Sequence, residues 1–277
     1  MSASEGYKAP GIAGSGAIAC GLAASATALG KVILLARSDA SAWRAEEKAS
    51  GLAGKVEGGD ASNLKVTTQA GDLSHCDLMV EAIAEDHDAK VGLLQDLGAA
   101  CPDADLGTTT SSLSIAKVGE EAGHPGRVFG LHPFNPVTKM ELIELCVTDG
   151  AREGLAERAR AWCHALGKTV VSVPDQTGFV VNRLLFPFLF DAVRLHENTG
   201  MEAADVDRCM TLGAAHPMGP LALLDMVGLD VAEQIGDSLH EATGVSHYGP
   251  PEELRRMVAA GKLGRKSGKG FFGYEKK

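Results

Sequence analysis

Short apolar runs alternate with segments of helical pattern over the first part of the chain. The helical pattern covers residues 17–29, the SAWRAEEKA stretch and residues 89–100. The runs of strand length are Val32–Leu35, Asp77–Ala84, Leu106–Thr110, Val128–Leu131 and Thr169–Val173. Short buried strands separated by helices are typical of a parallel sheet with right-handed crossovers. We therefore expect a doubly wound α/β sheet, with ligands bound beyond the carboxyl ends of its strands.

The pattern changes after Pro174, which closes the last of these strands. Residues 178–243 form long helical stretches with no strand pattern between them, and the chain ends in the glycine-rich basic segment GKLGRKSGKGFFGY. A change from alternating strands and helices to helices alone marks a domain boundary. The sequence predicts a Rossmann-like α/β domain over residues 1–175 and an all-helical domain over residues 176–277.

Composition and charge exclude several classes of partner. The net charge of −10 argues against a nucleic-acid surface, because such surfaces gather lysine and arginine on one face. The six cysteines have neither CxxC spacing nor local pairing, which predicts reduced thiols, no disulfide frame and no metal site. The chain has no strongly apolar run of about 18 residues and no convincing signal peptide, so we expect no membrane span and a cytoplasmic location.

The segment Gly14-x-Gly16-x-x-Ala19 is the first candidate for ligand binding. Gly14 would form the tight turn, Gly16 would let the backbone approach a pyrophosphate, and Ala19 would allow close packing of helix on strand. The alternative is an Ala/Gly-rich run with two glycines in phase, because Pro10 and Gly11 interrupt the strand that should precede the loop. We interpret the segment as a dinucleotide-binding loop.

The residues after the second strand bear on which dinucleotide binds. An NAD site places a carboxylate at the end of this strand, where it binds the ribose 2′-hydroxyl. Here the strand runs into Ala36-Arg37-Ser38, and Arg37 with Ser38 can accommodate a 2′-phosphate. In the alternative, Arg37 is a solvated loop cation and Asp39 binds the ribose. The sequence favours NADP over NAD.

His132 and Glu144 are the candidates for proton transfer. His132, in the segment GLHPFNP, follows an apolar run and is predicted to lie at the carboxyl end of a strand. Residues 140–145 alternate like a strand and place Glu144 among apolar neighbours. A carboxylate on one ring nitrogen fixes the tautomer of a histidine and raises its basicity, which leaves the other nitrogen for proton exchange. A lone histidine is more often structural, and the nearby acid is what favours catalysis.

Two further polar groups stand out. The hydroxyl cluster Thr108–Ser112 follows a short strand, where it can hydrogen-bond a substrate oxygen or cap the helix that begins near Ser114. Asn182 lies in the apolar segment FVVNRLL, so its amide is either a satisfied core group or points into a cleft between the domains. The residues alone leave both pairs of alternatives open.

Together these motifs resemble the 3-hydroxyacyl-CoA dehydrogenase family, in the short single-function form of bacterial 3-hydroxybutyryl-CoA dehydrogenases. The resemblance runs from Gly14 to Tyr274. Its segments, in the family's order and spacing, are VEAIAED with Lys90, TTTSSLSI, GLHPFNP, ELIE, DQTGFVVNRLL, HPMGPLALLDMVGLD, HYGPP and LGRKSGKGFFGY. The resemblance implies an NAD(P)-dependent oxidoreductase of fatty acid metabolism, which moves a hydride between the cofactor and C3 of a 3-hydroxyacyl thioester. It also implies a homodimer formed through the helical domain.

The resemblance gives individual residues a role. His132 matches the catalytic base and Glu144 the carboxylate that pairs with it. Ser111 and Asn182 match the residues that contact the 3-oxygen of the substrate, and Asn135 matches an amide of the site. The positions expected to bind the cofactor are Gly14, Gly16, Ala19, Arg37, Ser38, Glu85, Lys90 and Asn135.

The chain also departs from the family pattern. The second-strand acid is missing, Thr109 replaces an asparagine, Pro133 replaces a phenylalanine, and residues 39–76 form a shorter region than usual. Because this region helps to bind the CoA moiety in the family, an acyl-carrier-protein thioester becomes an alternative substrate. A non-thioester 3-hydroxy acid such as carnitine or a sugar acid is another alternative substrate. The hypothesis from a different class is a non-catalytic relative that binds nucleotide or serves structurally.

Overall fold

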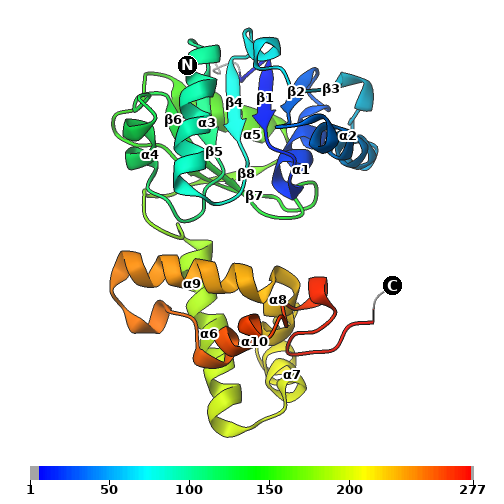
Figure 1. Cartoon of the computed structure of the whole chain (residues 1–277), viewed down its shortest axis with the longest axis vertical. Helices are drawn as coiled ribbons and strands as arrows, with labels where there is room; N and C mark the ends of the chain where they lie inside the picture. Colours follow the sequence, from blue (N-terminus) through cyan, green and yellow to red (C-terminus); the bar gives the residue numbers. More distant parts are fainter. Residues whose placement is uncertain (1–5, 276–277) are drawn as a thin grey trace. The chain divides into compact units, whose positions relative to one another are not determined.

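In the computed structural model, which describes residues 6–275, the chain folds as two compact units. The first unit ends at Gln176 and the second begins at Thr177. Strands and helices alternate in the first unit, whereas the second is helical (Figure 1). The α/β fold followed by an all-helical part, predicted from the sequence, is confirmed.

The first unit is built on one sheet, whose strands in the described part of the chain follow the order β3-β2-β1-β4-β5-β6-β7-β8. The strands are β1 Pro10–Ala13, β2 Val32–Leu35, β3 Leu64–Thr67, β4 Leu78–Glu81, β5 Asp105–Thr108, β6 Val128–Pro133, β7 Leu142–Cys146 and β8 Thr169–Ser172. Because the chain winds outward in both directions from β1, the order reverses between β1 and β4. Such a switch point opens a crevice at the carboxyl ends of the strands.

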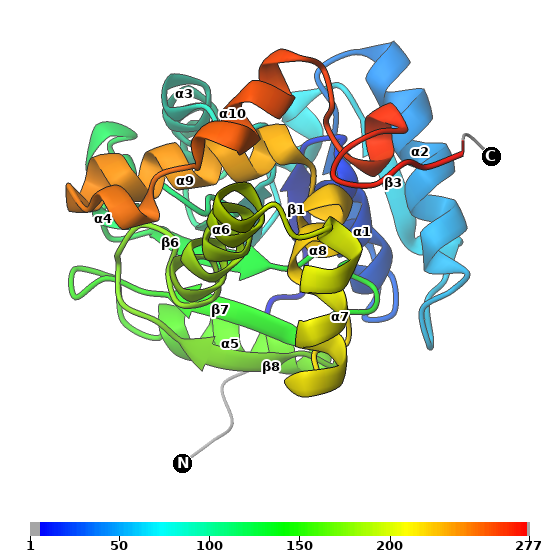
Figure 2. The same ribbon diagram turned by 90° about the horizontal axis from the view of Figure 1, so that it is seen from below.

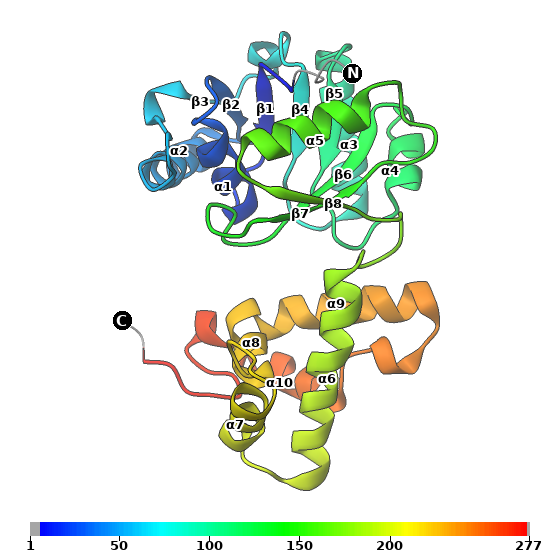
Figure 3. The ribbon, with the colours of Figure 1, turned by 180° about the vertical axis from the view of Figure 1, so that it is seen from behind.

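Helices cover both faces of this sheet. They are α1 Ala17–Ala26, α2 Asp39–Ala53, α3 His87–Ala100, α4 Ile115–Glu121 and α5 Leu155–Ala165. Apolar side chains of α1, α2 and α5 form one buried cluster with β1, β2 and the later strands. Helices α3 and α4 contact β4, β5 and β6. Figure 1 shows α3 and α4 in front of the strands, and Figure 3 shows α5 across the opposite face.

Two expectations about the sheet are corrected by the structure. Pro10 and Gly11 do not interrupt the first strand: β1 is regular and pairs with both β2 and β4. Pro10 is tolerated because it is the first residue of the strand. Gly11 leaves room for the Met79 side chain, whose sulfur a Cβ at this position would overlap. The sheet is also not fully parallel, because β7 pairs antiparallel to β6.

The second unit packs its helices around a separate apolar core. The helices are α6 Val181–Thr199, α7 Ala203–Gly213, α8 Pro220–Val227, α9 Leu229–Thr243 and α10 Glu252–Ala259. Figure 2 shows α9 and α10 side by side next to α6, in agreement with their contacts. The basic C-terminal segment is fastened to α8 by Asp225, whose buried carboxylate accepts hydrogen bonds from the backbone N–H groups of Phe271 and Phe272 and from the Tyr274 hydroxyl. No helix in residues 6–275 has the length and apolar composition to cross a membrane.

Candidate active site

A cavity of about 770 Å³ opens at the carboxyl ends of β1, β2 and β4, where the strand order reverses. Its walls are residues 13–18 after β1, residues 35–37 after β2 and residues 82–85 after β4. Thr68, Ala70, Leu93, Thr109 and Asn135 complete the lining. The volume is within the range of small-molecule and cofactor sites. The cavity therefore lies at the place that the topology assigns to a ligand.

The glycines at the start of α1 shape one wall of this cavity. Gly14 has φ +144°, and a Cβ there would overlap the carbonyl oxygen of Ala82 and lie 3.1 Å from the Cβ of Ala19. Gly16 precedes α1, and a Cβ there would meet no heavy atom within 4 Å, so the backbone is open to a ligand. The first turn of α1 carries no acidic residue that would oppose an anion. These features fit a pyrophosphate bound to the amino end of the helix.

The end of β2 forms the opposite part of the cavity. Ala36 is buried and Arg37 is exposed, and both line the space. Ser38 caps α2, where its hydroxyl accepts a hydrogen bond from the Ser41 backbone N–H at 3.4 Å. Asp39 lies in the first turn of α2, and its carboxylate accepts a hydrogen bond from Thr68 at 3.3 Å. At this end the residues that line the cavity carry one cation, Arg37, and no carboxylate.

His132 and Glu144 lie opposite each other in the antiparallel pair β6–β7. The Nδ1 of His132 is 2.7 Å from the Oε2 of Glu144, and both side chains are buried, with residue exposures of 7% and 1%. Because an ionised carboxylate only accepts hydrogen bonds, this contact places the imidazole proton on Nδ1 and assigns proton exchange to Nε2. Shortly after β6, Asn135 lines the cavity. The structure thus brings together the acid and histidine that the sequence singled out.

The hydroxyl cluster after β5 is held by Glu85, which follows β4. One carboxylate oxygen of Glu85 accepts hydrogen bonds from the Thr110 hydroxyl at 2.6 Å, the Ser111 N–H at 2.8 Å, and the N–H and hydroxyl of Ser112. Burial raises the pKa of Glu85, but Lys90 and these donors outweigh it and hold the pKa below its usual range. Glu85 is therefore a carboxylate at neutral pH, and it fixes the loop that carries Ser111.

The cap of α4 is Ser114, which lies just outside the Thr108–Ser112 cluster for which capping was the structural alternative. Its hydroxyl accepts a hydrogen bond from the Lys117 backbone N–H and donates one to Asp175. Asp175 also accepts from the first backbone N–H groups of α4, those of Ile115 and Ala116. Asp175 is not among the site residues predicted from the sequence. An acid placed soon after a strand-closing proline was its only available signal.

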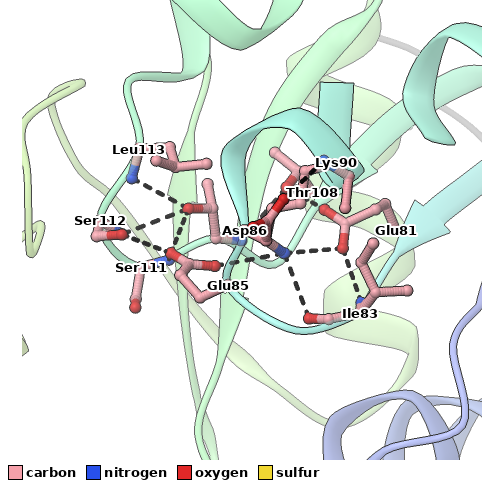
Figure 4. Close-up of polar contacts among 11 residues, drawn as sticks. Glu81, Ile83, Glu85, Asp86, Lys90, Thr108, Ser111, Ser112 and Leu113 are labelled. Carbon is pink, nitrogen blue, oxygen red and sulfur yellow. Dashed lines mark hydrogen bonds and ion pairs between the residues drawn. The ribbon is translucent and has the colours of Figure 1, made fainter. Parts of the chain in front are cut away.

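Lys90 and Glu81 contact Glu85 and Ile83 from behind and do not themselves line the cavity. Lys90 is fully buried in α3, with its Nζ 2.8 Å from the Oε1 of Glu81 and 3.4 Å from the Oε2 of Glu85. Glu81, the last residue of β4, was not identified from the sequence, because the run Asp77–Ala84 was taken only as a strand. A buried acid inside an apolar run was the signal that could have found it. Figure 4 shows this network.

Asn182, the remaining predicted residue, belongs to the second unit. It is the second residue of α6 and is mostly buried. Among residues 6–275, no group of three or more histidine, cysteine, aspartate or glutamate side chains is arranged to hold a metal ion.

Comparisons with known proteins agree with this architecture. Residues 10–176 match the family model of the 3-hydroxyacyl-CoA dehydrogenase NAD binding domain, and residues 178–274 match that of its C-terminal domain. A 3-hydroxybutyryl-CoA dehydrogenase of Mycobacterium tuberculosis is 45% identical over 214 residues, which cover 76% of this chain and 75% of the relative. The rat mitochondrial hydroxyacyl-coenzyme A dehydrogenase is 41% identical over 77% of this chain and 69% of the relative. The crystal structure of the (S)-3-hydroxybutyryl-CoA dehydrogenase of Ralstonia eutropha superimposes with a TM-score of 0.91 at 31% identity, covering 98% of this chain and 100% of that one.

Proposed function

Because the chain belongs to the 3-hydroxyacyl-CoA dehydrogenase family, we propose that it interconverts 3-hydroxybutyryl-CoA and acetoacetyl-CoA with a nicotinamide cofactor. The enzyme class, an oxidoreductase with an NAD-binding domain, follows from the family. The observation that carries the reaction is the buried His132–Glu144 pair at the end of β6, three residues before Asn135, which lines the cavity. The relatives that bear the name 3-hydroxybutyryl-CoA dehydrogenase support the short acyl chain.

The cofactor is bound by the residues around the cavity. We propose that the Gly14–Ala19 loop and the amino end of α1 bind the pyrophosphate, since an open backbone and an unopposed helix dipole are available there. Residues 82–85 and Asn135 line the remainder of the cavity. When bound, the nicotinamide ring supplies or accepts the hydride.

The chain's own residues move the proton. In oxidation, Nε2 of His132 takes the proton of the 3-hydroxyl group, and in reduction the imidazolium returns it to the forming alkoxide. Glu144 accepts the Nδ1 hydrogen bond throughout and stabilises the charged ring. Ser111 is proposed to donate a hydrogen bond to the 3-oxygen, and Asn182 keeps its predicted role as an amide donor to the substrate.

The test of this function is an assay of the purified chain with acetoacetyl-CoA. We expect NADH or NADPH to be consumed, and the loss of the cofactor's near-ultraviolet absorbance measures this consumption. Free 3-hydroxy acids, carnitine included, serve as the competing substrates with the oxidised cofactors. Turnover of a free acid together with no turnover of any acyl-CoA would refute the proposal.

We further propose that the preferred cofactor is NADP. The support is the absence of a carboxylate among the residues that line the cavity at the end of β2, together with the presence of Arg37 there. An arginine at this position pairs with a 2′-phosphate, whereas an NAD site uses an acid.

Replacing Arg37 with aspartate is then expected to weaken NADPH binding by about 30- to 100-fold, because a charge-assisted contact is lost and a like charge is added. NADH affinity should change by no more than about threefold. Fluorescence titration of the two cofactors measures both. Arg44→Asp on the exposed face of α2 makes the same change in charge away from the cavity and should leave both affinities unaltered. Equal losses for the two cofactors would contradict the assignment of Arg37.

A homodimer and a cytoplasmic location are proposals of the same kind. The helical unit exposes several large apolar side chains, which favours burial against a second copy: Leu184, Leu195, Met201, Leu212 and Met226. The cysteines are free thiols, which suits a reducing compartment. Light scattering, which reports the mass in solution, tests the dimer, and a monomer at micromolar concentration would refute it.

A further inference from the structure

We propose that Glu81 is a positioning residue for this reaction: its buried carboxylate fixes Lys90 and, through Lys90 and Glu85, the loop that carries Ser111. The inference rests on the proposed function, because that function places Ser111 at the substrate oxygen. Figure 4 shows the three charged side chains in a row, from the end of β4 toward the loop after β5.

Glu81 has no access to solvent, and both oxygens of its carboxylate accept hydrogen bonds. Its exposure is 0%, and its Oε1 accepts hydrogen bonds from the Ile83 N–H at 2.7 Å and from Lys90 at 2.8 Å. Its Oε2 accepts one from the hydroxyl of Thr108 at 2.6 Å, the residue paired with it across β4 and β5. Burying an ionised carboxylate is costly unless it is paired and hydrogen-bonded, so this set of donors gives the side chain a single arrangement.

Lys90 transmits this arrangement to Glu85. Its ammonium group has three donors, and three acceptors surround it: Glu81 at 2.8 Å, Glu85 at 3.4 Å and the carbonyl oxygen of Ile83 at 3.5 Å. The shortest of these contacts is the one to Glu81. The position of the ammonium group is therefore set by the buried acid, and the longer contact to Glu85 depends on it.

Glu85 in turn fixes the backbone at Ser111 and Ser112. The same Glu85 oxygen accepts both of their N–H groups, at 2.8 and 3.0 Å. If the charge of Glu81 is removed, Glu85 becomes the carboxylate partner of Lys90, and the ammonium group moves toward it. Lys90 contacts Oε2 of Glu85 and the loop donors contact Oε1, so a Glu85 side chain drawn toward Lys90 moves its Oε1 away from the loop, and the Ser111 backbone loses its fixed place. A displacement of about 1 Å is enough to lower turnover strongly in an oriented site.

The test is Glu81→Gln, which keeps the size of the side chain and removes its charge. We expect kcat for acetoacetyl-CoA reduction to fall by about 10- to 100-fold, while the dissociation constant of NADH stays within about threefold. Hydrogen exchange should become at least about tenfold faster at the amides of Ser111 and Ser112, with β4 and β5 still protected. Thr108→Val removes one donor to Glu81 without changing charge, and it also removes the hydroxyl that accepts the Thr110 N–H at 3.3 Å. It should give the same signature more weakly. If the first variant does not fold, wild-type turnover and loop protection in Thr108→Val would contradict the positioning role.

Asp105→Asn provides the matched control. Asp105 is as buried as Glu81 and lies at the start of β5, where Arg152 and Arg158 pair with it. Its substitution should lower stability but leave kcat and the exchange of the Ser111 amide unchanged. If kcat falls in both variants in proportion to their loss of stability, or if Glu81→Gln retains the turnover and loop protection of the wild type, the positioning role is wrong. A wild-type chain without activity on acetoacetyl-CoA would instead refute the proposed function, while the exchange measurement would still decide the role of Glu81.

Discussion

Replacement of His132 by alanine is expected to lower kcat for acetoacetyl-CoA reduction by about 10³-fold, within the range typical of a lost general acid–base group. The imidazole is the group that the proposed mechanism uses to exchange a proton with the 3-oxygen. NADH affinity should be retained to within about twofold, because His132 is not among the residues that line the cavity. The measurements are steady-state kinetics and a fluorescence titration of NADH on the same preparation.

The control for His132→Ala is His164→Ala, the same substitution at an exposed position on α5. It should leave kcat unchanged. The variant at position 132 also removes the imidazole that pairs with the buried Glu144, so we expect a loss of about 3 kcal/mol in the free energy of unfolding. Unfolding in urea separates this effect from the loss of turnover, since the folded fraction is then known at the assay temperature. Substantial turnover by folded protein would show that the base is another residue.

The strands predicted from apolar runs are found in the structure. The run Val32–Leu35 is β2, which is buried, and a buried parallel strand requires a continuous apolar segment. The run Thr169–Val173 contains β8, which lies at the edge of the sheet and is mostly exposed. Strand β3, Leu64–Thr67, was not predicted. It lies at the edge of the sheet and is only partly buried, so its pattern does not differ from that of a polar loop. The direction of β7 was not predictable either, because alternation reports which face is buried and not whether the neighbouring strand is parallel.

Within the site, the residues that could be predicted from the sequence are those whose role is indicated by their own segment of the chain. Glu144 was identified because it interrupts a run of alternating apolar residues, and the antiparallel register then places it opposite His132. Glu81 was missed for the converse reason. Its importance depends on Lys90 and Thr108, which approach it from a helix and from a neighbouring strand. Ser38 shows the same limit, since a hydroxyl at the end of β2 suits a ligand and a helix cap equally, and the structure places it in the cap.

Replacing Glu144 with glutamine is the second change for which we expect a large effect, a fall in kcat of about 10²- to 10³-fold. The amide is nearly isosteric, so the contact with Nδ1 of His132 is preserved in space while its charge is lost. A glutamine can present its NH₂ group to Nδ1 as well as its oxygen, and the first arrangement places the imidazole proton on the wrong nitrogen. Steady-state kinetics with acetoacetyl-CoA measures the fall, and Glu141→Gln, an exposed acid just before β7, is the matched control that should retain wild-type turnover.

The double variant His132→Ala/Glu144→Gln decides whether the two residues act as one unit. If Glu144 serves catalysis only through the imidazole, the double variant should be no slower than His132→Ala alone, because the second change removes a partner that has nothing left to orient. It should also be more stable than His132→Ala, since the buried carboxylate, which has lost the imidazole in the single variant, is replaced by a neutral amide. Multiplicative losses in kcat would instead mean that the carboxylate contributes to turnover independently of the histidine, and the role proposed for Glu144, which acts only through the imidazole, would be wrong.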